Sequence, residues 1–115
     1  MPNVPRKYVV EAACQEVKVE IEPGDRTARA SYARWLAAYV LREQAGASLG
    51  DIRDALSLAS HASVHRGLAA CREAIEKGDN GIHIGGQYFA GSIVEAASRI
   101  WTKATIRAAT ERTAA

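Results

Sequence analysis

The chain has 115 residues, a formal net charge of +2 and two cysteines, Cys14 and Cys71. That length suits one domain with a hydrophobic core of its own, without disulfides or metals to support it. Its apolar stretches all fall short of the roughly 20 residues that a membrane span needs, and no secretory segment precedes the cysteines. We therefore expect a soluble, cytoplasmic protein with reduced cysteines.

Positive charge is concentrated in the middle of the chain. Residues 1–25 hold three basic and five acidic side chains (−2), residues 26–72 hold seven arginines and three acidic side chains (+4), and residues 73–115 balance five against five. Arginine presents a planar fork of donors that suits phosphate oxygens and guanine edges. The distribution favours a nucleic-acid partner for the central segment, and the alternative is a set of ordinary solvated helix faces.

The first part of the chain predicts a helix and a turn. Alanine is abundant and large aromatic residues are few, which predicts an all-α domain with closely packed helices. A helix is predicted over residues 5–16, with Asn3 as its cap and Pro5 in its first turn. Residues 17–22 alternate apolar and charged side chains, which suits a short strand or an extended connector, and residues 23–25 form a turn.

A longer helix is predicted after the basic loop of residues 26–29. It is predicted to begin at about Ser31 and to end at Gly46, which suits a C-cap because glycine adopts positive φ freely. Its inner face consists of Trp35, Leu36, Tyr39 and Val40. At this spacing the two aromatic residues are predicted to be core residues and not a platform for stacking bases.

Two helices joined by a short turn follow. Ser48 and Asp51 form a capping box for a short helix with an apolar stripe of Leu49, Ile52, Ala55 and Leu56, and residues 57–59 form the turn. Ser60 is predicted to cap the next helix, whose buried face is Val64, Leu68, Cys71 and Ile75. Gly67 permits the close approach of a neighbouring helix or of a DNA backbone.

Beyond Gly78 the sequence changes character. Residues 79–89 predict a small β-hairpin, and Ser92 with Glu95 forms a second capping box. The helix that starts there is predicted to reach Thr110, with apolar positions at Ile93, Val94, Ala97, Ile100, Trp101 and Ala104. Its periodicity suits packing onto its own domain or pairing with another chain.

The central block resembles the C-terminal DNA-binding domain of the bacterial replication initiator DnaA, over about residues 9–76. The matching residues are Ala37-Ala38-Tyr39-Val40-Leu41-Arg42-Glu43, Ser48-Leu49, Ile52, Ala55 and Ser60-His61-Ala62-Ser63-Val64. The resemblance implies an all-α domain over residues 1–78 with a helix-turn-helix of the DnaA C-terminal or Trp-repressor-like type, to which residues 79–115 add the hairpin and a C-terminal helix. The initiator's ATPase signature, Gly-x-x-x-x-Gly-Lys, is absent.

The resemblance implies sequence-specific binding of double-stranded DNA by a transcriptional or replication regulator without ATPase activity. A recognition helix puts its first turns into the major groove, where each base pair has a distinct pattern of donors and acceptors. The predicted base-reading residues are Ser60, His61, Ala62, Ser63, His65 and Arg66. The residues predicted to contact the DNA backbone or the minor groove are Arg26, Arg29, Arg34, Arg42, Ser48 and Arg53.

The alternative is a protein-interaction module that keeps the fold but has lost base reading, because Ser60 and Ala62 stand where the family has an acidic residue and a hydroxyl. Residues 92–110 would then bind a protein partner or pair two copies as a homodimer. His61 and His65 have metal-ligand spacing without a third ligand in reach, so we expect no metal and no cofactor. No nucleophile stands beside a base, so we expect no enzyme.

Overall fold

A computed structural model describes residues 4–22, 24–58 and 60–114. These residues form five α-helices and one two-stranded antiparallel sheet. The elements are α1 (Arg6–Val17), α2 (Ala28–Glu43), α3 (Leu49–Ala55), α4 (His61–Glu76), β1 (Gly81–Ile84), β2 (Gln87–Ala90) and α5 (Ile93–Ala114). The prediction of a mainly helical domain with one short hairpin is confirmed.

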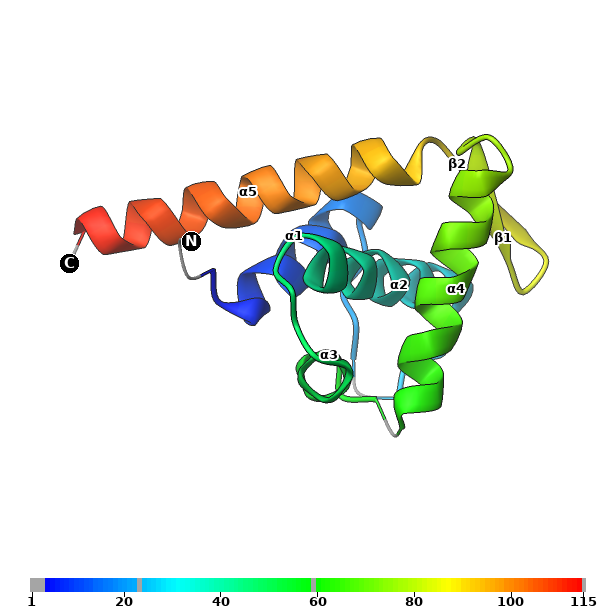
Figure 1. Cartoon of the computed structure of the whole chain (residues 1–115), viewed down its shortest axis with the longest axis horizontal. Helices are drawn as coiled ribbons and strands as arrows, with labels where there is room; N and C mark the ends of the chain where they lie inside the picture. Colours follow the sequence, from blue (N-terminus) through cyan, green and yellow to red (C-terminus); the bar gives the residue numbers. More distant parts are fainter. Residues whose placement is uncertain (1–3, 23, 59, 115) are drawn as a thin grey trace.

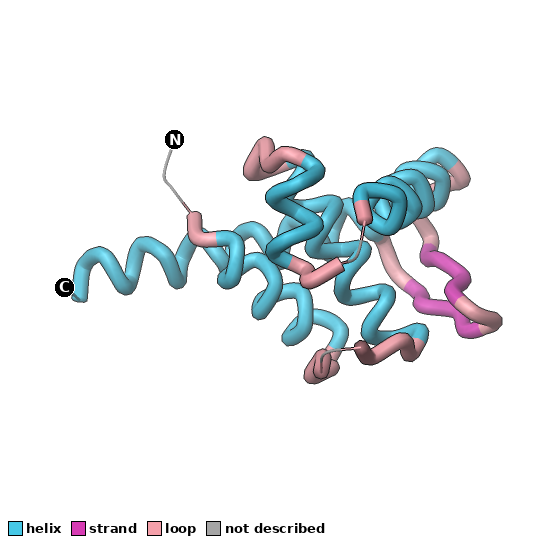
Figure 2. Tube along the Cα trace, turned by 90° about the horizontal axis from the view of Figure 1, so that it is seen from below, coloured by secondary structure: helices cyan, strands magenta, loops and turns pink. Residues whose placement is uncertain are grey.

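The helix α2 is the centre of the fold. It packs against α1, α4 and α5, and it also contacts α3. In Figure 1, α3 is seen end-on while α4 runs across the view, so these two helices point in very different directions. Figure 2 shows the hairpin at one end of the molecule and the last turns of α5 projecting at the other. The segment from α3 to α4 is therefore held on one side of a scaffold made of α1, α2 and α5.

The core is built from medium aliphatic side chains and many alanines. Leu36, Val40 and Leu41 of α2 are fully buried, as are Val9 of α1 and Ile100 of α5. Alanines at the helix contacts are buried as well, namely Ala12, Ala13, Ala33, Ala37, Ala38, Ala96, Ala97, Ala104 and Ala108. Burying each leucine or isoleucine side chain contributes about 1.5–3 kcal/mol. Small residues bring the helix backbones close, as the composition predicted.

Both ends of α2 differ from the prediction. The helix α2 begins at Ala28, three residues before Ser31, because the hydroxyl of Thr27 accepts a hydrogen bond from the Ala30 N–H at 3.2 Å. Arg29 therefore lies in a helix and not in a loop. The helix also ends at Glu43, and the chain then turns through Gly46 with φ +66°.

The N-terminal helix α1 starts at Arg6 with Pro5 at the N-cap position and no side-chain cap. The predicted cap, Asn3, and the turn residue Pro23 lie outside the described residues. Residues 19–22 contain no strand, so this segment is the extended connector that the sequence also allowed.

The helix α5 is fastened at its start by Asp79, which lies just after α4. The Asp79 carboxylate accepts hydrogen bonds from the Ile93 N–H at 2.7 Å and the Val94 N–H at 3.3 Å, and from the Ser92 hydroxyl. The Ser92 hydroxyl oxygen in turn accepts from the Glu95 N–H at 3.0 Å, as predicted. The N–H groups of the first turn of α5, which have no acceptor within the helix, are therefore hydrogen-bonded by the side chains of Asp79 and Ser92.

The rest of α5 packs back along α1 and α2. Arg99 makes a salt bridge to Glu16 at 2.9 Å, and Arg107 pairs with Glu11. The inner face matches the prediction except at Val94, in the first turn of α5, which is 48% exposed. The helix also runs four residues beyond Thr110, to Ala114. None of the described helices combines the length and apolar character needed to cross a membrane.

Candidate nucleic-acid interface

The segment from Ser48 to Ser57 is a capped short helix and a sharp turn. The Ser48 hydroxyl accepts a hydrogen bond from the Asp51 N–H at 3.1 Å, which confirms the predicted N-cap. Ser57 adopts φ +54°, and the following Leu58 N–H donates to the Arg53 carbonyl at 2.9 Å. This reversal directs the chain from the end of α3 toward the start of α4. Ala59 lies outside the described residues.

Ser60 occupies the N-cap position of α4, but its side chain makes no cap hydrogen bond. The predicted capping interaction is therefore wrong, although the predicted start of the helix is right. Ser60 has an extended backbone, with φ −154° and ψ 161°, and its side chain is exposed. Its hydroxyl does not close the start of α4, so it is free to hydrogen-bond a group outside the chain.

The two faces of α4 separate as the sequence predicted. Val64, Leu68 and Cys71 are buried, and Ile75 is half-buried. The opposite face is exposed and consists of His61, Ala62, His65, Arg66, Ala69 and Arg72. The sequence of α4 has no acidic residue before Glu73. The first three turns of the helix therefore present imidazole, methyl and guanidinium groups to the outside.

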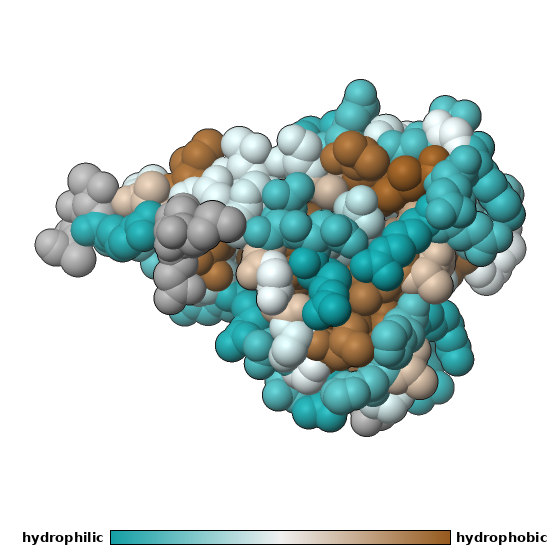
Figure 3. Space-filling view, in the orientation of Figure 1, coloured by the Kyte–Doolittle hydropathy of each residue, from teal (hydrophilic) through white to brown (hydrophobic). Residues whose placement is uncertain are grey.

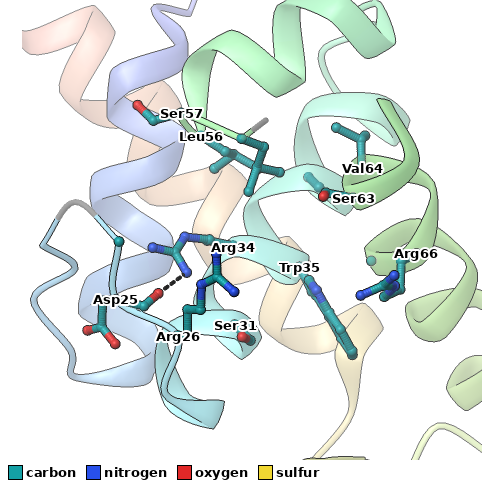
Figure 4. Close-up of a pocket in the computed structure, with 14 residues that line it drawn as sticks. Asp25, Arg26, Ser31, Arg34, Trp35, Leu56, Ser57, Ser63, Val64 and Arg66 are labelled. Atoms are coloured by element: carbon teal, nitrogen blue, oxygen red, sulfur yellow. Dashed lines mark hydrogen bonds between the residues drawn. The ribbon is translucent and has the colours of Figure 1, made fainter. Parts of the chain in front are cut away.

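The base-reading candidates within this helix have three different surroundings. Ser63 and Arg66 border a cavity between α4 and the start of α2, as Figure 4 shows. His61 instead faces α3, where its Nε2 atom lies 3.3 Å from Nη1 of Arg53. A guanidinium only donates, so in a hydrogen bond between these two atoms Nε2 is the acceptor. Ala62 and His65 are exposed.

Three of the arginines predicted to contact DNA also hold the fold together. Arg29 donates to the Val17 carbonyl at 3.0 Å, Arg34 to the Asp25 carbonyl at 2.5 Å and Arg42 to the Ala47 carbonyl at 3.0 Å. Each of these carbonyls is at the end of a helix or in a connector, where regular secondary structure leaves acceptors unpaired. Part of the donor set of each guanidinium is therefore used inside the protein.

The remaining predicted backbone contacts have different surroundings. Arg53 is paired with Asp54 at 3.1 Å. Arg26 is exposed and makes no hydrogen bond, ion pair or ring contact with the described residues. Ser48 is occupied as the cap of α3. Of this group, Arg26 alone is entirely uncommitted.

The cavity beside α4 has a volume of about 410 Å³ and collects several of these side chains. Figure 4 shows Arg26 and Arg34 on one side, Arg66 on the other and the Trp35 ring between them. The ring packs on Gly67, where an added Cβ would lie 2.7 Å from Cδ1 of Trp35. Gly67 therefore serves the close approach of α4 to α2, which decides between the two roles that the sequence allowed for it.

Apolar surface is also visible in this region. Figure 3 shows brown, apolar side chains in the hollow between α3 and α4, bordered by hydrophilic residues. A second apolar area lies over the first turns of α5. Apolar surface thus lies beside α4 on the face that Figure 3 shows.

Two titratable groups near α2 are shifted by their surroundings. The Thr27 backbone N–H, followed by the Thr27 hydroxyl, lowers the pKa of Asp25, and the charge of Arg34 acts in the same direction. Burial raises the pKa of the Cys71 thiol to about 12. Within the described parts of the chain, no three His, Cys, Asp or Glu side chains gather to hold a metal ion.

No protein-family model, no curated protein and no solved structure matches the chain. Sequence reasoning missed the part that Trp35 plays, because its spacing on α2 predicted only a core position. Trp35 is half-buried, contacts Gly67 through its five-membered ring and lines the cavity. The available signal was a tryptophan on one helix and a glycine within another. The sequence alone does not show that these two helices pack against each other.

Proposed function

We propose that the chain binds double-stranded DNA in a sequence-specific manner, with α3 and α4 as a helix-turn-helix and α4 as its recognition helix. In this proposal the unit is of the DnaA C-terminal or Trp-repressor-like type and serves a transcriptional or replication regulator. The observation that carries the proposal is the exposed face of α4. Its first three turns hold polar and cationic groups without an acidic side chain, while the opposite face is anchored in the core.

Base reading would use the side chains that no other part of the protein occupies. His65 and Arg66 are exposed, and His61 can offer its Nδ1 atom because Arg53 lies at Nε2. A guanidinium can donate two hydrogen bonds to the O6 and N7 atoms of guanine, and a methyl group such as that of Ala62 suits thymine. A good bidentate contact is worth about 1–3 kcal/mol of discrimination against the wrong base.

Phosphate contacts would come from the two sides of α4. Arg26 lies in the connector before α2 and is uncommitted, while Arg53 lies beside His61 at the start of α4. Backbone contacts of this kind fix the register of the protein on the duplex but carry no sequence information. They make binding weaken as salt concentration rises, because each neutralised phosphate releases counterions.

The test begins with selection of bound duplexes from a random pool, followed by fluorescence anisotropy on the enriched sequence. Arg66→Ala should weaken binding to that sequence about tenfold and relax the preference at one base pair. Arg26→Ala should weaken binding to all sequences alike and reduce the salt dependence by about one phosphate contact.

Arg112→Ala is the matched control, because this substitution removes the same charge from the far end of α5. Arg112 has no partner among the described residues. It should leave binding nearly unchanged. Enrichment of no sequence, together with equal displacement by every competitor duplex, would refute specific binding.

A further inference from the structure

The cavity between α2 and α4 has a cationic border that the protein itself does not neutralise. Three guanidinium groups line it, from Arg26, Arg34 and Arg66, and Asp25 is the one carboxylate among its lining residues. These four side chains sum to a charge of +2 (three positive and one negative). Asp25 is already engaged as an acceptor of the Thr27 N–H at 2.9 Å. The cavity lining therefore has a net positive charge that no side chain of the lining neutralises.

Most arginines of the chain have a partner within the protein, and two of those that have none lie at this cavity. Eight of the eleven arginines pair with a carboxylate or donate to a backbone carbonyl of the protein. Among the described residues, Arg26, Arg66 and Arg112 make no hydrogen bond, ion pair or ring contact. Two of these three border one cavity. Guanidinium groups left without partners on both sides of a concave site indicate an anionic ligand there.

The other residues that line the cavity favour a phosphate monoester as the anion. The lining includes the hydroxyl-bearing residues Ser31 and Ser63 and the half-buried Trp35. A phosphate monoester carries close to two negative charges at neutral pH and has three strong acceptor oxygens. It therefore matches both the charge of +2 and the mixture of guanidinium and hydroxyl donors. The volume of about 410 Å³ is within the range of small-ligand sites.

We propose that this cavity binds a nucleoside monophosphate, with the phosphate between Arg26 and Arg66 and the base against Trp35. Figure 4 shows the Trp35 side chain between those of Arg26 and Arg66 at this cavity. Binding of the nucleotide does not depend on the proposed DNA-binding function. A second consequence does rest on that function: the DNA backbone offers the same phosphate chemistry, so bound nucleotide competes with DNA for the two guanidinium groups.

Isothermal titration calorimetry of the full chain tests the site, with adenosine monophosphate, adenosine and inorganic phosphate as the probes. Adenosine monophosphate should bind with one-to-one stoichiometry and more tightly than either fragment. Arg26→Ala and Arg66→Ala should each weaken binding at least about tenfold, because each removes charge-assisted hydrogen bonds. Arg112→Ala removes the same charge elsewhere and should change the affinity less than about twofold. Equal thermal unfolding midpoints of the three variants would establish that the fold is intact.

The outcomes separate the site from the DNA-binding function. No saturable binding of adenosine monophosphate up to millimolar concentration overturns the proposal, as does an equal loss of affinity in Arg112→Ala and Arg66→Ala. If the nucleotide fails to bind while Arg26→Ala and Arg66→Ala weaken duplex binding, the phosphate chemistry belongs to the DNA backbone and the nucleotide site is refuted. If the nucleotide binds and no duplex does, the site stands and the proposed function falls.

Discussion

Gly67 provides a direct measure of how closely α4 packs on α2. Replacing it by alanine places a Cβ 2.7 Å from Cδ1, 3.1 Å from Cγ and 3.3 Å from Nε1 of Trp35. Carbon atoms in contact prefer separations of about 3.5–4.0 Å, so the ring or the helix has to move by several tenths of an ångström or more. The atoms that clash are at the base of the indole, near the α2 backbone, where the side chain has little freedom to yield.

Two opposing terms set the size of the effect. Alanine is favoured over glycine in a helix interior by about 0.5–1 kcal/mol. Overpacking of a closely packed contact costs about 1–3 kcal/mol. We expect the second term to win, so that Gly67→Ala lowers the free energy of unfolding by about 1–2 kcal/mol. For a domain of this size that corresponds to a fall of about 4–8 °C in Tm.

Gly50 supplies the matched control, because it is also a helical glycine and it lies in α3. There an added Cβ would meet its nearest neighbours, Nε2 of His61 and Oγ of Ser48, at the ordinary distances of 3.8 and 3.9 Å. Gly50→Ala should therefore raise the stability by up to about 1 kcal/mol. Urea denaturation followed by circular dichroism measures both variants. A Gly67→Ala protein as stable as the wild type would refute the close packing of α4 on Trp35.

Three further predictions concern helix caps and thiols. Ser48→Ala should lower the free energy of unfolding by about 1 kcal/mol, whereas Ser60→Ala, at a cap position without a cap bond, should change it by less than about 0.5 kcal/mol in the same urea assay. Asp79→Gly keeps the positive φ of this position but removes the acceptors at the start of α5, and should cost about 1–2 kcal/mol; a loss below about 0.5 kcal/mol would contradict the cap. In the native protein, a thiol reagent at mildly alkaline pH should modify half-buried Cys14 before buried Cys71, whose pKa of about 12 keeps it protonated, and the reverse order by mass spectrometry would refute this.

The helices that the sequence predicted best are those with a clear apolar periodicity. The spacing of Val64, Leu68 and Cys71 identified the buried face of α4, because only one side of a surface helix can meet the core. The hairpin followed from the Gly85-Gly86 pair between two short apolar runs, and both glycines adopt positive φ in the turn. These features depend on neighbouring residues alone, so local rules suffice for them.

The errors arose where one residue type has several equally good local uses. Threonine and serine both favour the N-cap position, and in the structure Thr27, not Ser31, caps α2. The prediction that Arg34 contacts DNA stays untested, and the sequence did not indicate that one of its donors holds the Asp25 carbonyl nine residues away. No local pattern distinguishes an arginine that binds an external phosphate from one that pairs with a carbonyl of its own chain. That choice depends on which segments the tertiary structure brings together.

The salt bridges between α1 and α5 bear on the order in which the chain folds. Glu16 meets Arg99 and Glu11 meets Arg107, across sequence separations of 83 and 96 residues. Contacts that close loops this long carry a large entropic cost until the intervening helices are in place. The helix α1 also packs on α2, its neighbour in sequence, so we expect the contacts between α1 and α5 to form late in folding and α5 to detach first in the native state. Backbone amides of α5 should then exchange with solvent faster than those of α2, and equal protection of the two helices would contradict this order.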